Sequence, residues 1–408
     1  MANNTVKIAL ITGYLGAGKT TLLNHILSND EGIRAAVIVN DIGEVNVDAD
    51  LIEKGGVVTQ ENSNLVPLTN GCICCTLRDD LAAQLGELAS TGKYDYIIIE
   101  ASGICEPIPI AQTIADICEE STEDGMPMVL DNIIAVVDCA RMHDEFEDGR
   151  SLLKDTYEEE DIENLLIQQL EFCNTVLMNK VDTVDEYQLG ELKAIIRSLQ
   201  TSAVIIEANY AKVAIADVLN TGRFDLEKSM ESAGWIEAIQ QDNDDDDEHE
   251  HHHHDDDDEK EEKHHKGGHH HHHHHHHHNA DASYQVEEYG IGSFVYFRRR
   301  PFDRNKIIAL AEKWPRSIIR CKGMIWYKEE PDMSYIFEQA GHMIQEMQSG
   351  RFLASADQAS IDRVLEKYPQ VRKMWDPVYG DRMQKLVFIG QNMDRKEIEE
   401  QLDACLVD

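Results

Sequence analysis

Three cysteines within four positions, Cys72, Cys74 and Cys75, are the densest group of reactive side chains in this sequence. Thr76 and Asp79 follow with the spacing of a helix capping box, so we expect a helix to begin near Thr76. The positive end of that helix would lie beside the sulfurs and lower the pKa of the thiols. Thiolates bind soft or borderline ions such as Zn²⁺ and Cu⁺, so the motif predicts a metal site.

A tetrahedral zinc site needs a fourth ligand, which three thiolates do not supply. Asp41 and Glu44 are candidates for it, and a bound water is the alternative. A redox thiol cluster and inert core cysteines are rival interpretations, although a disulfide between such close neighbours would be strained. The other cysteines lie mostly in or beside apolar stretches, where we expect small buried side chains: Cys105, Cys118, Cys139, Cys173, Cys321 and Cys405.

Histidines form a second group of metal-binding side chains. Residues 249–278 hold 17 of the 20 histidines and end in a run of ten. Imidazoles interleaved with carboxylates offer many shallow sites for Zn²⁺, Co²⁺ or Ni²⁺, so we expect a metal reservoir here. An expression tag would explain the last run only, because other histidine clusters precede it.

A glycine-rich segment predicts binding of phosphate. Residues 13–20, GYLGAGKT, match G-x-x-x-x-G-K-[ST] and stand between an expected strand and an expected helix. The backbone N–H groups would surround phosphate oxygens, Lys19 would neutralise β/γ-phosphate charge, and the Thr20 hydroxyl would ligate Mg²⁺. The nucleotide contacts that we expect from this segment come from Gly13, Gly16, Gly18, Lys19, Thr20 and Thr21.

Two further motifs follow expected strands. Glu100 ends the strand YDYIIIE, where its carboxylate can hold Mg²⁺, and Gly103 allows the backbone to approach the γ-phosphate. Asn179, Lys180 and Asp182 come directly after the strand NTVLM. Ionised Asp182 can accept two hydrogen bonds from guanine, whereas adenine lacks that donor pair, so GTP is favoured over ATP.

These motifs need a scaffold of alternating strands and helices. Val/Ile-rich runs such as KIALIT and NIIAVVD alternate with helical patterns, which predicts an α/β domain with a mostly parallel sheet over residues 1–235. Residues 240–283 are rich in Asp, Glu and His, and their composition predicts a disordered linker. SFVYFRR, SIIRCKGMIWY and QKLVFIG predict strands of a smaller α+β domain over 285–408.

The formal net charge of −40 argues against nucleic acid or an anionic membrane surface as a partner, because either would be repelled. Apolar runs stay short of the roughly 20 residues that a membrane helix needs. The N-terminal stretch reads as a first strand without a cleavage site, so we expect reduced cysteines and a cytoplasmic protein.

Five motifs follow one another along the chain: GYLGAGKTT, NDIGEVNVD, GCICC, EASG and NKVD. In this order and spacing, they resemble the metal-handling P-loop GTPases, specifically the CobW-type zinc metallochaperones. SFVYFRRRPF, WPRSIIRCKGMIW and LVFIGQ resemble the CobW C-terminal domain. The resemblance implies GTP hydrolysis coupled to metal binding at Cys-x-Cys-Cys and transfer to a client metalloprotein. It gives Lys19 and Glu100 catalytic roles, and assigns guanine recognition to Asn179, Lys180 and Asp182. Members of the family differ in metal and client.

Residues 40–48 and the three cysteines both fall between the phosphate loop and Glu100. We therefore expect nucleotide state to change metal affinity, and zinc to change GTP affinity in return. Alternatives are a metal buffer that stores ions on the histidines, and an insertase that matures a cobalt, nickel or iron enzyme. The sequence leaves the oligomeric state open, a homo-oligomer included, and names no general base, so slow intrinsic turnover is expected.

Overall fold

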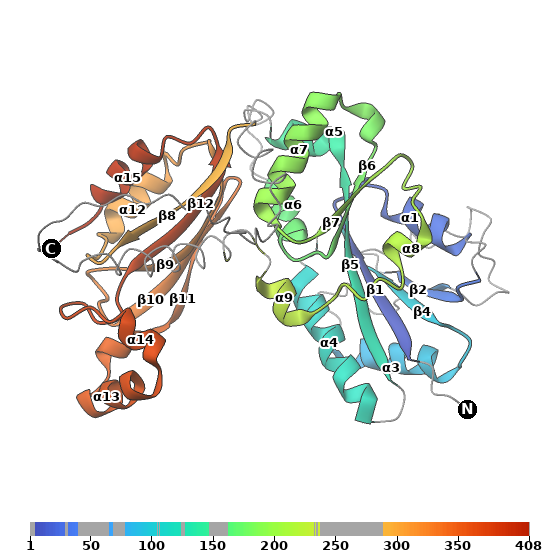
Figure 1. Cartoon of the computed structure of the whole chain (residues 1–408), viewed down its shortest axis with the longest axis horizontal. Helices are drawn as coiled ribbons and strands as arrows, with labels where there is room; N and C mark the ends of the chain where they lie inside the picture. Colours follow the sequence, from blue (N-terminus) through green and yellow to red (C-terminus); the bar gives the residue numbers. More distant parts are fainter. Residues whose placement is uncertain are drawn as a thin grey trace, which may run out of the picture.

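The structure is a computed structural model of the 408-residue chain. It describes residues 5–28, 32–39, 65–67, 78–103, 105, 107–123, 127–146, 162–231, 233, 236 and 289–407. Two β-sheets, each with its own helices, lie side by side (Figure 1). The predicted linker, 240–283, lies outside the described residues, as do Asp41, Glu44 and the three clustered cysteines.

The N-terminal sheet has seven strands in the order β3-β2-β4-β1-β5-β6-β7, and every pairing between neighbours is parallel. The predicted α/β fold is confirmed, and six of these strands coincide with apolar runs of the sequence. The strands are β1 (Val6–Thr12), β2 (Ala35–Val39), β3 (Leu65–Pro67), β4 (Tyr96–Glu100), β5 (Met128–Asp138), β6 (Thr175–Asn179) and β7 (Val204–Ala208).

The two faces of this sheet carry separate apolar cores. Along β1, Ile8 and Leu10 belong to one core and Ala9 and Ile11 to the other, as the two-residue period of a strand requires. Helices cover both faces of the sheet, which explains why β1, β2, β4 and β6 are largely apolar and buried. The first core contains α3 (Arg78–Ser90), α4 (Pro107–Glu123), α5 (Cys139–Phe146), α6 (Ile162–Glu171) and α7 (Glu186–Leu199). The second contains α1 (Lys19–Leu27) and α8 (Ile215–Val218).

The C-terminal sheet is antiparallel, with its strands in the order β11-β10-β9-β12-β8. This confirms a smaller second domain. Its strands are β8 (Ile291–Arg298), β9 (Ile318–Trp326), β10 (Met333–Ala340), β11 (Met343–Arg351) and β12 (Gln384–Gln391). Its helices are α12 (Arg304–Ala311), α13 (Gln358–Lys367), α14 (Pro369–Lys373) and α15 (Arg395–Asp403).

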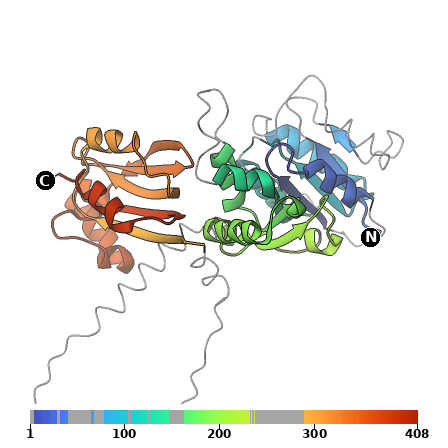
Figure 2. The same ribbon diagram turned by 90° about the horizontal axis from the view of Figure 1, so that it is seen from above.

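Apolar side chains of the second domain pack into the first. Ile291, Ile319 and Ala340 belong to the same buried cluster as Ile167 and Leu170 of α6. The C-terminal sheet therefore places one face against its own helices and the other toward α6 and α7, as both views show (Figures 1 and 2). No helix in the described part of the chain is long and apolar enough to cross a membrane.

Candidate nucleotide-binding site

The strand order and direction bring the sequence motifs together at the carboxyl ends of the strands. β4, β1, β5 and β6 are consecutive neighbours, and all of them run in the same direction. The glycine-rich loop follows β1, Glu100 ends β4, and Asn179 ends β6. Because ligands of parallel α/β sheets bind at the carboxyl ends of the strands, the three motifs lie where a single nucleotide could touch all of them.

The glycine-rich loop between β1 and α1 has the backbone that phosphate binding needs. Gly18 caps α1 in the left-handed region with φ 112°, and a Cβ at this position would lie 2.4 Å from Asn179 Nδ2. Lys19 is 7% exposed, and its ammonium donates to the carbonyl of Gly13 over 2.9 Å. The lysine is thus folded back over the loop, beside the start of α1, where the helix dipole favours an anion.

The motif after β4 packs directly on this loop. Glu100 is the register partner of Ile11, two residues before Gly13, and its carboxylate is buried at 1% exposure. A Cβ on Gly103 would lie 2.9 Å from the backbone nitrogen of Leu15, so only glycine allows this approach. The Glu100 carboxylate and the Thr20 hydroxyl are oxygen donors of the kind that Mg²⁺ takes, so the site suits that ion.

Asn179 braces the site. Its Nδ2 donates to the carbonyl of Ala17 over 2.8 Å, and its Oδ1 accepts the backbone N–H of Ala211 over 2.9 Å. With 2% exposure and both ends of its amide engaged, Asn179 ties the glycine-rich loop to the loop after β7. Any contribution that it makes to guanine binding therefore includes holding these two loops in place.

Lys180 and Asp182 follow in a tight turn. Lys180 has a left-handed backbone with φ 60°, and its ammonium contacts Asp138 Oδ2 over 2.6 Å. Asp182 lies in the short 3₁₀ turn that comes next, and its side chain is exposed. The carboxylate proposed to read guanine is therefore open to a ligand, while the lysine is held in place by the end of β5.

The loop after β7, residues 209–212, carries no motif that would mark it in the sequence. Asn209 Oδ1 accepts the N–H of Asp182 over 3.1 Å, and Ala211 holds Asn179. Tyr210 and Ala211 both have positive φ, 56° and 51°. This loop positions the guanine motif through its backbone and one amide. The one sequence feature that could have drawn attention to this loop is its position directly after the predicted strand beside β6, because loops at the carboxyl ends of parallel strands form ligand sites.

The six scattered cysteines are buried, as predicted. Burial raises the pKa of Cys118 to about 11 and that of Cys139 and Cys173 to about 12. These thiols stay protonated at neutral pH and are unsuited to metal binding. Within the described residues no cluster of three or more His, Cys, Asp or Glu side chains could hold a metal ion.

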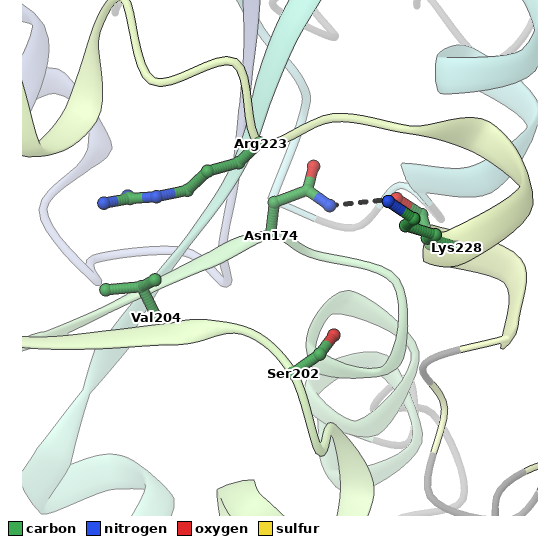
Figure 3. A pocket seen from close by; sticks show the side chains of 6 residues that line it. Asn174, Ser202, Val204, Arg223 and Lys228 are labelled. Atoms are coloured by element: carbon green, nitrogen blue, oxygen red, sulfur yellow. Dashed lines mark hydrogen bonds between the residues drawn. The ribbon is translucent and has the colours of Figure 1, made fainter.

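A pocket lies at the other end of the strands, where β6 and β7 begin (Figure 3). Its lining side chains are bonded within the protein. Asn174 Nδ2 donates to Ser229 over 2.9 Å, and the Arg223 guanidinium donates to Thr175 Oγ1 and the Asp217 carbonyl. The pocket therefore forms part of the packing at this end of the strands and has no connection to the nucleotide motifs.

Comparison with known proteins supports the assignment of both domains. Residues 7–207 match the family described as CobW/HypB/UreG, nucleotide-binding domain, and residues 291–406 match the cobalamin synthesis protein cobW C-terminal domain. The chain is 33% identical over 417 residues to zinc-regulated GTPase metalloprotein activator 1 of Dictyostelium discoideum, which covers 98% of this chain and 79% of that protein.

Two bacterial proteins are similar over a shorter stretch. The zinc chaperone CobW of a Sinorhizobium species is 34% identical over 53% of this chain and 63% of its own length. The zinc chaperone YjiA of Escherichia coli is 30% identical over 56% of this chain and 65% of its own length. The chain therefore belongs to the CobW/HypB/UreG family of P-loop GTPases and carries a CobW C-terminal domain.

Proposed function

We propose that this GTPase is a zinc metallochaperone, which binds zinc at Cys72, Cys74 and Cys75 and transfers it to a client metalloprotein. The observation that carries the proposal is the 33% identity, over 98% of this chain, with a relative named as a zinc-regulated GTPase metalloprotein activator. Both bacterial relatives are named zinc chaperones as well.

The chemistry of the cysteines favours the clustered thiols as the metal ligands. Burial raises the pKa of five of the six scattered cysteines, to about 12 for Cys139 and Cys173, so these five thiols do not form thiolates at neutral pH. The sixth, Cys105, is buried. This leaves Cys72, Cys74 and Cys75 for thiolate chemistry, with Asp41 or Glu44 as the fourth ligand of a tetrahedral site. Free thiolates need a reducing compartment, so we place the protein in the cytoplasm.

In the nucleotide site, we assign phosphate binding to the glycine-rich loop and Lys19. Thr20 and Glu100 would hold Mg²⁺, which stabilises charge on the transferred phosphoryl group. Asp182 would accept hydrogen bonds from guanine. The buried position of Glu100 supports its part, because a carboxylate away from water interacts strongly with a cation.

Nucleotide and metal would be linked through the segment that follows β2. Val39, the last residue of β2, is the register partner of Glu100. β2 thus ends beside the proposed Mg²⁺ ligand, and residues 40–48, with Asp41 and Glu44 among them, follow it in the sequence. We infer that GTP and Mg²⁺ order this segment and that hydrolysis relaxes it, so that zinc affinity depends on nucleotide state.

The test measures zinc affinity of the full chain in the nucleotide-free, GDP-bound and non-hydrolysable GTP-bound states. A chain with residues 242–278 deleted removes histidine binding from the signal. We expect one tight zinc per chain, a loss of at least about 100-fold with Cys74→Ala, and no loss with the buried control Cys118→Ala. Equal zinc affinity in all three states would sink the coupling, and tight zinc in Cys74→Ala would sink the site.

The histidine-rich stretch supports a second candidate, a metal buffer, because it holds 17 of the 20 histidines. The same deletion separates the two. A chaperone keeps its tight thiol site and GTP hydrolysis, whereas a buffer loses most of its bound metal. Competition among Zn²⁺, Co²⁺ and Ni²⁺ for the thiol site of the deleted chain would identify the metal and test the insertase alternative.

A further inference from the structure

Helix α6 lies between the nucleotide-binding domain and the C-terminal domain, and it bonds to both. Positions 169 and 171 are about 200° apart around the helix axis, so their side chains leave on roughly opposite sides. Gln169 contacts the segment after β4, and Glu171 contacts β9 of the second domain. The body of the helix is fixed by Ile167 and Leu170, which are fully buried in the core between the two sheets.

On the first side, Gln169 holds the backbone of Gly103. Its Nε2 donates to the Gly103 carbonyl over 3.1 Å, and the side chain is 2% exposed. Its Oε1 is also buried and accepts no hydrogen bond from any residue that the structure describes. Burying a polar oxygen without a hydrogen bond costs free energy, because the oxygen loses its contacts with water. An apolar side chain of the same size would fill this place without that cost, so packing does not explain a glutamine here.

On the second side, Glu171 is clamped by Arg320 of β9. The Arg320 guanidinium makes a bidentate contact, with Nε and Nη2 donating to the two Glu171 oxygens over 2.7 and 3.0 Å. Nη2 also donates to Glu338 over 2.6 Å, and Nη1 to the Gln339 carbonyl over 3.2 Å. Arg320 is fully buried, so this contact fixes the end of α6 in both distance and direction.

The other end of α6 is held as well. Asn164 Nδ2 lies 3.3 Å from Met343 Sδ at the start of β11, and a Cβ on Gly341 would lie 2.9 Å from Glu163 Cβ. The C-terminal domain therefore grips α6 near both ends. A rotation or shift of α6 would move Gln169 relative to Gly103.

We propose that Gln169 is a positioning residue for GTP hydrolysis, and that Arg320 acts through it by fixing α6 from the C-terminal domain. The inference rests on the proposed placement of Glu100 and Gly103 at the γ-phosphate. In the docked arrangement Gln169 holds the Gly103 carbonyl, and this restrains the peptide segment that follows Glu100. A client or metal that displaced the C-terminal domain would thereby slow hydrolysis.

The first experiment measures steady-state GTP hydrolysis by the full chain carrying Gln169→Met, which keeps the length of the side chain and removes the donor. One neutral hydrogen bond corresponds to a fall in kcat of about 3- to 10-fold. The KM for GTP and the affinity for GDP should stay within about 2-fold, because the contact is not to the nucleotide. The matched control is Gln168→Met on the same helix, which should keep kcat.

Two results would overturn the positioning role. One is an unchanged kcat in Gln169→Met. The other is a rise in KM together with a loss of GDP affinity and a lower unfolding temperature, because that pattern reports general damage to the fold.

The second experiment tests the link to the C-terminal domain. Arg320→Lys keeps the charge and loses the bidentate geometry, and Glu171→Gln keeps the shape and loses the charge. Each should lower kcat about 2- to 5-fold in the wild-type background and have almost no further effect in Gln169→Met, because all three act on one contact. If the fold-losses in kcat of the single variants multiplied in the double variants with Gln169→Met, the link would be overturned. Glu171→Gln provides the result if Arg320→Lys does not fold.

Glu100→Gln separates a failure of this inference from a failure of the proposed site. Loss of hydrolysis in Glu100→Gln with full activity in Gln169→Met rejects the inference alone. Full activity in Glu100→Gln rejects the placement of the motif at the γ-phosphate, and with it the basis of the inference.

Discussion

Gly18 and Asn179 show how two single residues depend on one another. Gly18 has the left-handed backbone that begins α1, and the Asn179 amide occupies the space where its Cβ would be. Asn179 in turn reaches the loop after β7 through Ala211. The phosphate loop and the guanine motif are therefore joined by direct side-chain contact before any nucleotide binds.

We expect Gly18→Ala to lose nucleotide affinity by at least 10-fold and to destabilise the fold by about 1–3 kcal/mol, because the added Cβ strains the backbone and displaces Asn179. Isothermal titration with GDP and chemical unfolding measure the two effects. Gly86→Ala is the control, since nothing lies within 4 Å of its Cβ and it sits inside α3. That change should stabilise the chain by about 0.5–1 kcal/mol. Normal GDP affinity in Gly18→Ala would contradict this account.

At this scale, spacing in the sequence was enough to predict which residues form the nucleotide motifs, but not which other residues of the protein they contact. Asp182 and Lys19 could be named because each follows a strand in a pattern with a chemical meaning. Gln169 could not be named, because its partner Gly103 is 66 positions away and nothing local marks the contact. Roles that depend on long-range hydrogen bonds need the structure.

Among the elements, α7 has a first turn that is fixed by a capping box of local residues. Asp185 accepts the N–H of Gln188, and the Gln188 side chain accepts the N–H of Asp185, which completes a capping box. α7 follows the guanine motif after three residues and packs beside β8 through Tyr289, whose hydroxyl lies where a Cβ on Gly190 would be. The N-terminal part of α7 thus lies between the guanine motif and the segment that leads into β8.

Asp185→Ala should lower the free energy of unfolding by about 1 kcal/mol, because it leaves orphan N–H groups in the first turn. Asp185→Asn should keep most of the stability, since asparagine caps equally well. Chemical unfolding of the three proteins measures the difference. If the alanine and asparagine variants were equally unstable, charge at the helix end and not the cap would be the cause.

The elements could be predicted where burial is complete and less well elsewhere. β1, β2, β4, β5 and β6 are largely buried on both faces, and their apolar runs identify them. β7 is an edge strand with exposed residues, but its run of Val and Ile still marks it. β10 and β11 were not predicted. β11 is one of the two edge strands, mostly exposed, with Met, Gln and Glu mixed along it. β10 carries the charged Glu338, which contacts Arg320 beside α6. The clustered cysteines stay a prediction, outside the described residues.

Over the whole molecule, a buried ionic group joins the two domains. Burial alone would disfavour the charged guanidinium of Arg320, but Glu171 and Glu338 outweigh it and hold its pKa above the usual value. Burial likewise opposes ionisation of Glu338, yet Arg320 and Lys322 hold the pKa of that carboxyl below its usual 4.5. A carboxylate with a depressed pKa stabilises the folded chain only while it is ionised.

We therefore expect Glu338 to contribute its full stability above about pH 4.5, the ordinary glutamate pKa, and to lose it as pH falls through the lower folded value. Thermal unfolding between pH 7 and pH 3 measures this dependence. Glu338→Gln should be less stable than wild type at pH 7, and the difference should shrink at the acid end. A constant difference across that range would show that Glu338 does not titrate with folding.

The bidentate contact between Arg320 and Glu171 also bears on how this gene could be recombined. Suppose that this C-terminal domain, with Arg320, were joined to the nucleotide-binding domain of a relative that lacks a carboxylate at the end of α6. The guanidinium would then be buried with only one of its two carboxylate partners. The reverse exchange would bury Glu171 with no cation beside it. Exchange of domains among relatives is therefore favoured only when both positions are inherited together, and in descent the two should change as a pair.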